Sequence, residues 1–142
     1  MRPIVLRGPE RRIVAKTFID LTRMMRSVVC EDVPMGPADP NSTTALLVSA
    51  AILIGHVEGR PMNASKLSLY LALPRTTVLR HLRELQRLGV IKNHNGEYEL
   101  TEERAAASSP HIPKAIGVLS KAYTSLREMS SSETDTKPPS HQ

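Results

Sequence analysis

Hydrophobic residues recur at helical spacing near both ends of this chain. Between residues 10 and 29 the apolar positions step by four, three, four and three, and the same steps return between residues 112 and 126. Such a narrow stripe is typical of a helix that pairs with another helix. We therefore expect two amphipathic helices, at residues 10–29 and 112–129, and a dimer interface formed by Val14, Phe18, Leu21, Met25, Val28, Ile112, Ile116, Leu119, Tyr123 and Leu126.

A further helix is expected at residues 44–57, where nearly every position is apolar. A helix without a polar face is usually central and buried. Asn41 or Ser42 can cap its first turn, and Gly59 follows its end. The pattern predicts that this helix forms the middle of the hydrophobic core.

Two shorter helices are predicted next in the chain. The first occupies residues 64–71, with Asn63 as its cap. The second occupies residues 74–88, because proline is favoured at a first helical position and Gly89 is a typical helix end. Only a brief turn separates them, which is typical of a helix-turn-helix.

The pattern then becomes strand-like, in two short runs within residues 90–100. Asn95 and Gly96 stand between the runs, and this pair favours a tight hairpin turn because both turn positions need positive φ. Residues 101–109 predict a polar connector. Residues 130–142 contain nothing apolar to bury and predict disorder.

The order of these elements predicts a mainly α fold with a small β-hairpin. We expect a winged helix-turn-helix core flanked by N- and C-terminal dimerisation helices. The predicted domains are a basic N-terminal arm, helix and linker at 1–40, a DNA-binding winged helix-turn-helix at 41–104, a C-terminal dimerisation helix at 105–129 and a disordered tail at 130–142.

Positive charge is concentrated rather than spread along the chain. The net charge is +5, but residues 60–92 alone hold seven basic residues and one acidic residue, a net of +6. Such a concentration favours a polyanionic partner. Basic side chains on a helix face are often only a solvated surface. Here the neighbouring short helix and hairpin favour double-stranded DNA as the partner.

Helical periodicity divides residues 74–88 into two faces. Val78, Leu82 and Leu85 fall on one face, and the arginines fall largely on the other. Arginine can bind guanine through two hydrogen bonds, and the methyl of threonine can contact thymine. An exposed Leu79 could also touch a thymine methyl, or it could cover the short helix. The predicted base contacts are Arg75, Thr76, Thr77, Leu79 and Arg80.

Phosphate contacts depend on charge more than on exact geometry. Basic and polar side chains on both short helices and on the hairpin can supply them. The predicted phosphate contacts are Arg60, Asn63, Ser65, Lys66, Arg83, Arg87, Lys92 and His94.

The run GRPMNASKLSLYLALPRTTVLRHLRELQRLGVIKNHNGEYELTEE resembles the DNA-binding part of bacterial winged-helix regulators of the MarR and IclR type. The resemblance implies a transcription regulator. The likeness to MarR proteins also implies a homodimer held together by its first and last helices. Two alternatives stay open: a winged-helix module for protein-interaction or architectural contacts, and a replication or partition DNA binder.

Other functions find little support in the sequence. Cys30 is the only cysteine, and no catalytic, metal-binding or phosphate-loop motif is present, so we expect no enzyme activity, no metal and no cofactor. No apolar run approaches the ~20 residues that a membrane span needs, so we expect no membrane partner and a cytoplasmic, nucleoid-associated bacterial protein. A small-molecule effector stays open, but scarce aromatic residues point to no pocket for it.

Overall fold

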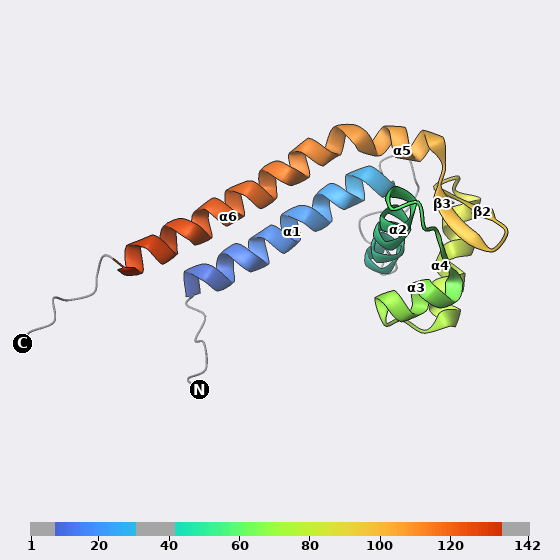
Figure 1. The fold of residues 1–142 in the computed structure, drawn as a ribbon, viewed down its shortest axis with the longest axis horizontal. Coiled ribbons are helices and arrows are strands. Elements are labelled where there is room, and N and C mark those ends of the chain that lie inside the picture. Colours follow the sequence, from blue (N-terminus) through green and yellow to red (C-terminus); the bar gives the residue numbers. More distant parts are fainter. Residues whose placement is uncertain (1–7, 31–41, 135–142) are drawn as a thin grey trace, which may run out of the picture. The chain divides into compact units, whose positions relative to one another are not determined.

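The computed structural model describes residues 8–30 and 42–134 (Figure 1). Its contacts divide the chain into two units, one of Met24–His111 and one of Met1–Arg23 with Ile112–Gln142. The cap predicted at Asn41 and residues 135–142 lie outside the described residues. The elements in order are α1 (Gly8–Cys30), α2 (Ser42–Val57), β1 (Met62–Asn63), α3 (Ala64–Leu71), α4 (Arg75–Arg87), β2 (Ile91–His94), β3 (Glu97–Leu100), α5 (Glu102–Ser108), the 3-10 turn η1 (Ser109–His111) and α6 (Ile112–Thr134).

The core of the unit Met24–His111 is built around α2, as the apolar run predicts. Val48 and Ile52 of α2 are fully buried, and α2 packs on α3, α4 and β3. However, the expectation of a helix buried all round is wrong. Leu47 is 48% exposed and Val57 is 73% exposed, because the core covers only one side of the helix.

A close backbone approach at the end of α2 turns the chain back toward the sheet. The Arg60 amide donates to the carbonyl of Gly55 at 2.8 Å. A Cβ on Gly55 would lie only 2.9 Å from the Arg60 carbonyl oxygen. Glycine at this helical position therefore lets the following residues pass close enough to join β3.

The strand β1 is an element that the sequence pattern does not predict. It pairs antiparallel with β3 through Met62 opposite Tyr98 and Asn63 opposite Glu97. The hairpin is thus part of a three-stranded sheet in the order β1-β3-β2. A strand of two residues is too short to show alternation, and only its pairing partner defines it.

The short helix α3 has the predicted bounds and the predicted cap. The Oδ1 atom of Asn63 accepts from the Lys66 amide at 2.9 Å. The turn after α3 is tight, with Ala72 at a φ of 54°, and the Ser68 hydroxyl donates to the Leu73 carbonyl at 2.6 Å. These contacts determine where α4 begins.

Helix α4 is one residue shorter at each end than predicted. Pro74 occupies the cap position rather than the first helical position, and Leu88 follows the last helical residue. Gly89 ends the helix as predicted, with a φ of 75°. Its amide bonds to the Gln86 carbonyl, and the Val90 amide bonds to the Leu85 carbonyl, which together form a Schellman motif.

The hairpin forms as predicted, between β2 and β3. Asn95 and Gly96 have φ values of 53° and 84°, as a two-residue turn of type I′ requires. The Gly96 amide also donates to Oδ1 of Asn93 at 2.8 Å. The register pairs Ile91 with Leu100, and these two buried residues join the base of the hairpin to the core.

The predicted polar connector at residues 101–109 is wrong, because this segment is helical. Thr101 caps α5, since its hydroxyl oxygen accepts from the Arg104 amide at 3.3 Å. Glu102 and Glu103 lie in the first turn, where the helix dipole favours carboxylates. Helix α6 likewise runs to Thr134, past the predicted end at residue 129.

The second unit consists of the first part of α1 and all of α6, which run side by side (Figure 1). None of its described side chains, in residues 8–23 and 112–132, is buried. Large apolar side chains stay exposed instead, among them Phe18 at 68% and Tyr123 at 64%. No described helix is long and apolar enough to cross a membrane.

The close approach at Gly55 generates a prediction about stability. Gly55→Ala should lower the free energy of unfolding by about 1–3 kcal/mol, because the added methyl would lie 2.9 Å from a backbone carbonyl oxygen and the chain must shift to make room. Urea denaturation followed by circular dichroism measures the change. Gly117→Ala in α6 is the matched control, because nothing lies within 4 Å of its Cβ position. An unchanged midpoint for Gly55→Ala would contradict this account.

Candidate nucleic-acid interface

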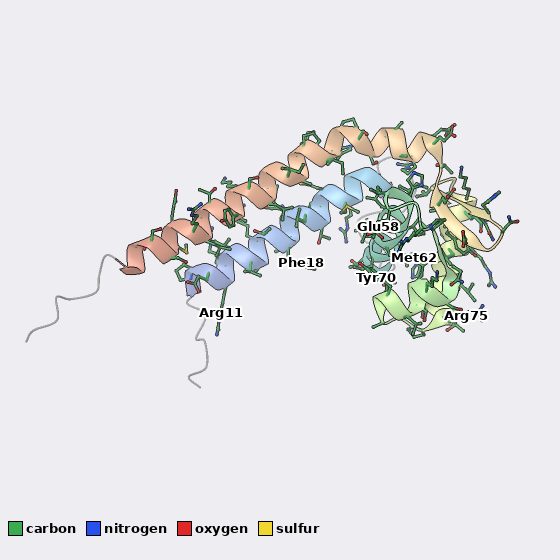
Figure 2. The ribbon with its side chains drawn as sticks, in the orientation of Figure 1. Arg11, Phe18, Glu58, Met62, Tyr70 and Arg75 are labelled. Carbon is green, nitrogen blue, oxygen red and sulfur yellow. The ribbon has the colours of Figure 1, made fainter. Side chains whose placement is uncertain are left out.

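Helix α4 divides into a buried face and a charged, exposed face. Val78, Leu82 and Leu85 are at most 1% exposed. Arg75, Arg80 and Arg83 are all exposed, and Arg75 projects near the start of the helix (Figure 2). The 100° step of the helix separates the two faces, so burying the apolar residues turns Arg80 and Arg83 outward. Arg75 is exposed because it is the first residue of the helix.

These three arginines have no ion-pair partner within the part of the chain that the structure describes. Their charge is therefore not neutralised by a neighbouring carboxylate. Exposed, uncompensated guanidinium groups along one helix are suited to a polyanion, because each group offers several donors in a planar fork.

The start of α4 adds backbone donors to the same face. Pro74 makes no side-chain cap hydrogen bond, and the first amide to bond within the helix is that of Val78, to the Pro74 carbonyl at 3.1 Å. The amides of Arg75, Thr76 and Thr77 therefore lack intrahelical acceptors, as at any helix start. Together with the helix dipole, they favour an anion beside Arg75.

Helix α3 contributes a smaller part of the surface. Ser65 and Lys66 are exposed in its first turn. Asn63, predicted to contact phosphate, is engaged through its Oδ1 atom as the helix cap. Any phosphate contact of Asn63 would therefore have to come from the NH2 group of its side chain. Arg60 is exposed on the segment before β1.

Arg87 differs from the other arginines because it is paired. Its Nε atom donates to Oε2 of Glu84 at 3.1 Å, and a second guanidinium nitrogen bonds to the other carboxylate oxygen. The hydrogen bond from Arg87 lowers the pKa of Glu84 below its ordinary value. The predicted phosphate contact of Arg87 therefore competes with this pair.

The wing, the β2–β3 hairpin, carries two glutamates against one lysine and is therefore not basic. Lys92 lies 3.9 Å from the Glu99 carboxylate, and His94 is directly opposite Glu97 in the strand register. Both predicted phosphate contacts thus have an acidic neighbour across the strands. The sequence shows these acids, but only the register places each one opposite a predicted contact.

Two other residues of α4 have a structural place. Leu79 is half-buried and packs on the hydrophobic core, which favours the packing role over contact with a thymine methyl. Thr77 is also half-buried. His81, a polar residue of the same helix, is buried at 4% exposure.

The predicted dimer residues fall into three groups. Six are large, exposed apolar side chains, while Leu21 and Leu126 are half-buried. Met25 is half-buried against the core of the unit Met24–His111, and the side chain of Val28 lies outside the described residues. The exposed six are Val14, Phe18, Ile112, Ile116, Leu119 and Tyr123.

Comparison with known proteins supports the fold and leaves the family open. No protein-family model matches the chain, and no curated protein sequence matches it. The solved transcriptional regulator MosR of M. tuberculosis is similar with a TM-score of 0.51 and 22% identity, over 88% of this chain and 90% of that chain. A transcriptional regulator of Thermotoga maritima is similar with a TM-score of 0.51 and 20% identity, over 91% of this chain and 89% of that chain.

The fold is a winged helix-turn-helix. The solved neighbours and the order of α3, α4 and the β2–β3 hairpin confirm the predicted mainly α fold with its winged core. The likeness to bacterial winged-helix regulators is confirmed at the level of the fold. The dimerisation role of the flanking helices stays a prediction.

The Glu84–Arg87 pair generates a prediction about protonation. Arg87→Gln should raise the pKa of Glu84 toward its ordinary value, because the largest cause of the lowering is lost. A lowered pKa stabilises the folded state above the pKa of the unfolded chain, and this contribution fades as pH falls through the folded value. Carbon-detected NMR titration of the Glu84 carboxyl measures the shift. Arg83→Gln should leave it unchanged, because neighbouring residues in a helix do not face each other.

Proposed function

We propose that this protein binds double-stranded DNA sequence-specifically as a transcription regulator, in the bacterial cytoplasm. The observation that carries the proposal is the exposed face of α4, where Arg75, Arg80 and Arg83 have no carboxylate partner in the described part of the chain. The solved neighbours named above are transcriptional regulators, which supports the same role. No catalytic activity forms part of this proposal.

Helix α4 is the element proposed to enter the major groove. In helix-turn-helix proteins the N-terminal part of this helix meets the base edges. That part carries Arg75, Thr76 and Arg80, all exposed, and we assign them to base contacts with Thr77 and Leu79 at the margin. Guanine is the natural partner of each arginine, since O6 and N7 accept two hydrogen bonds from one guanidinium.

The phosphate contacts are proposed to come mainly from the helices. Arg83, Lys66, Ser65 and Arg60 are exposed and have no acidic partner in the described residues. Arg87 and Lys92 share their charge with Glu84 and Glu99, and His94 lies opposite Glu97 in the strand register, so each would contribute less. We therefore propose that the wing lies on the flanking backbone but supplies a minor part of the affinity.

A homodimer formed by α1 and α6 is proposed to bring two α4 helices to one DNA site. The two helices line a common groove. The residues that line it show which side of each helix faces the groove. At 100° per residue, the exposed apolar stripe lies roughly 130° from the groove-facing residues on both helices. The two helices are antiparallel (Figure 1), so equal angles of this kind place the apolar stripe of α1 and the apolar stripe of α6 on the same side of the helix pair. A second copy can cover this continuous apolar surface.

A band-shift titration at two salt concentrations tests the DNA proposal. Arg83→Ala should weaken binding to all sequences and reduce the slope of log affinity against log salt by about 0.9, as expected for one lost phosphate contact. Arg80→Ala should cost about 1–3 kcal/mol on the preferred sequence, obtained by selection from a random pool, and should relax the preference at one base pair.

Arg127→Ala is the matched control, because this exposed arginine lies on α6 rather than on α4. Its affinity should equal that of the unaltered protein. Undetectable or salt-insensitive DNA binding would overturn the proposal and favour a protein-interaction module. If the sequence selected from the random pool matched replication or partition loci, the other DNA-binding alternative would be favoured.

Sedimentation equilibrium tests the dimer separately. Leu119→Asp should shift the protein from dimer to monomer at tens of micromolar, because a carboxylate in the apolar stripe would be desolvated without a partner. Thr124→Asp places the same charge on the same helix roughly 120° from the stripe and should leave the dimer intact. A monomeric unaltered protein would contradict the dimer proposal.

A further inference from the structure

A groove runs between α1 and α6 within the second unit. Its volume is about 330 Å3, which falls within the usual range for small-molecule sites. It is lined from both helices, and the segments that form it lie within residues 12–20 and 118–125. The proposed DNA surface uses none of these residues.

The bottom of the groove is apolar. Ile13, Val118 and Ala122 line it. At 100° per residue, each lies on the part of its helix between the centre of the groove-lining side and the apolar stripe. Thr17 also lines this side, but its hydroxyl donates to the Ile13 carbonyl at 2.7 Å. Its proton is therefore turned to the backbone, so Thr17 offers little to a polar ligand.

The rim of the groove is cationic. Arg12, Lys16 and Lys121 line the side that faces away from the apolar stripes. Lys16 is neutralised by Asp20, with 3.0 Å between Nζ and Oδ2. Arg12 and Lys121 have no such partner in the described residues, so the groove retains a charge of two. Its two unpaired cations come from opposite helices.

This arrangement points to one class of ligand. We propose that the groove binds a free amphipathic carboxylate with a medium-length alkyl chain. The carboxylate would lie between Arg12 and Lys121, where charge-assisted hydrogen bonds are available, and the chain would cover Ile13, Val118 and Ala122. A cationic ligand would meet like charge at the same rim.

The site is compatible with the proposed dimer and independent of DNA binding. The rim faces away from the apolar stripes, so a second copy that covers the stripes leaves the groove open. The inference depends on neither proposal, because the groove lies within one chain. Ligand binding can be measured without DNA, so a failure of the DNA or dimer proposal can be told apart from a failure of the ligand proposal.

Isothermal titration of the full chain with decanoate, below its micelle concentration, tests the proposal. Decanoate should bind, and binding should weaken as salt is added, because the rim contacts are partly screened. Decyltrimethylammonium has the same chain and the opposite charge, and it should not bind. Equal binding of the two probes, or no binding of decanoate, would overturn the proposal.

Variants at the rim and at the groove bottom sharpen the test. Lys121→Gln should weaken decanoate binding about fivefold, the upper range for an exposed ion pair, and Lys121→Arg should restore it. Lys114→Gln, on the same helix outside the groove, should change nothing. Ala122→Leu should abolish binding without altering sedimentation. If Ala122→Leu instead dissolves a dimer, the groove belongs to the subunit contact and the ligand proposal is wrong.

Discussion

The packing of α4 against α2 is the interaction on which the rest of this structure depends. Val78, Leu82 and Leu85 are buried with Ile52 in one cluster, and the two helices contact each other directly. A helix is rigid, so burial of one face determines the direction of every side chain on the other. The outward direction of Arg80 and Arg83 is therefore a consequence of core packing, and these side chains need no contact of their own to be held outward.

The turns around α4 decide how this face is used. The turn at Ala72 leads from α3 into α4, and Gly89 reverses the chain into β2. In the wing, the strand register places Glu99 opposite Lys92 and Glu97 opposite His94. Helix α4, by contrast, carries one acidic residue and four arginines. The contrast places the uncompensated positive charge on the helix rather than on the hairpin, which is why the proposed affinity rests on α4.

The unit of α1 and α6 follows a different principle. It has no buried side chain among residues 8–23 and 112–132, so hydrophobic burial within one chain contributes little to it. Its apolar stripes and its cationic groove point in different directions on the same two helices. One surface suits a second copy of the chain, and the other suits an amphipathic anion.

The sequence by itself determined the helices other than α5, the tight turn at Asn95 and Gly96, the cap at Asn63 and the outward Arg80 and Arg83, because these depend on local periodicity and backbone preference. It did not determine β1 or the pairing of Lys92 with Glu99, which depend on strand register across the chain. It also misjudged residues 101–109, where the cap at Thr101 outweighs the polar composition. Only the tertiary structure decided which of the predicted cations are left without a carboxylate, because that depends on distances between side chains.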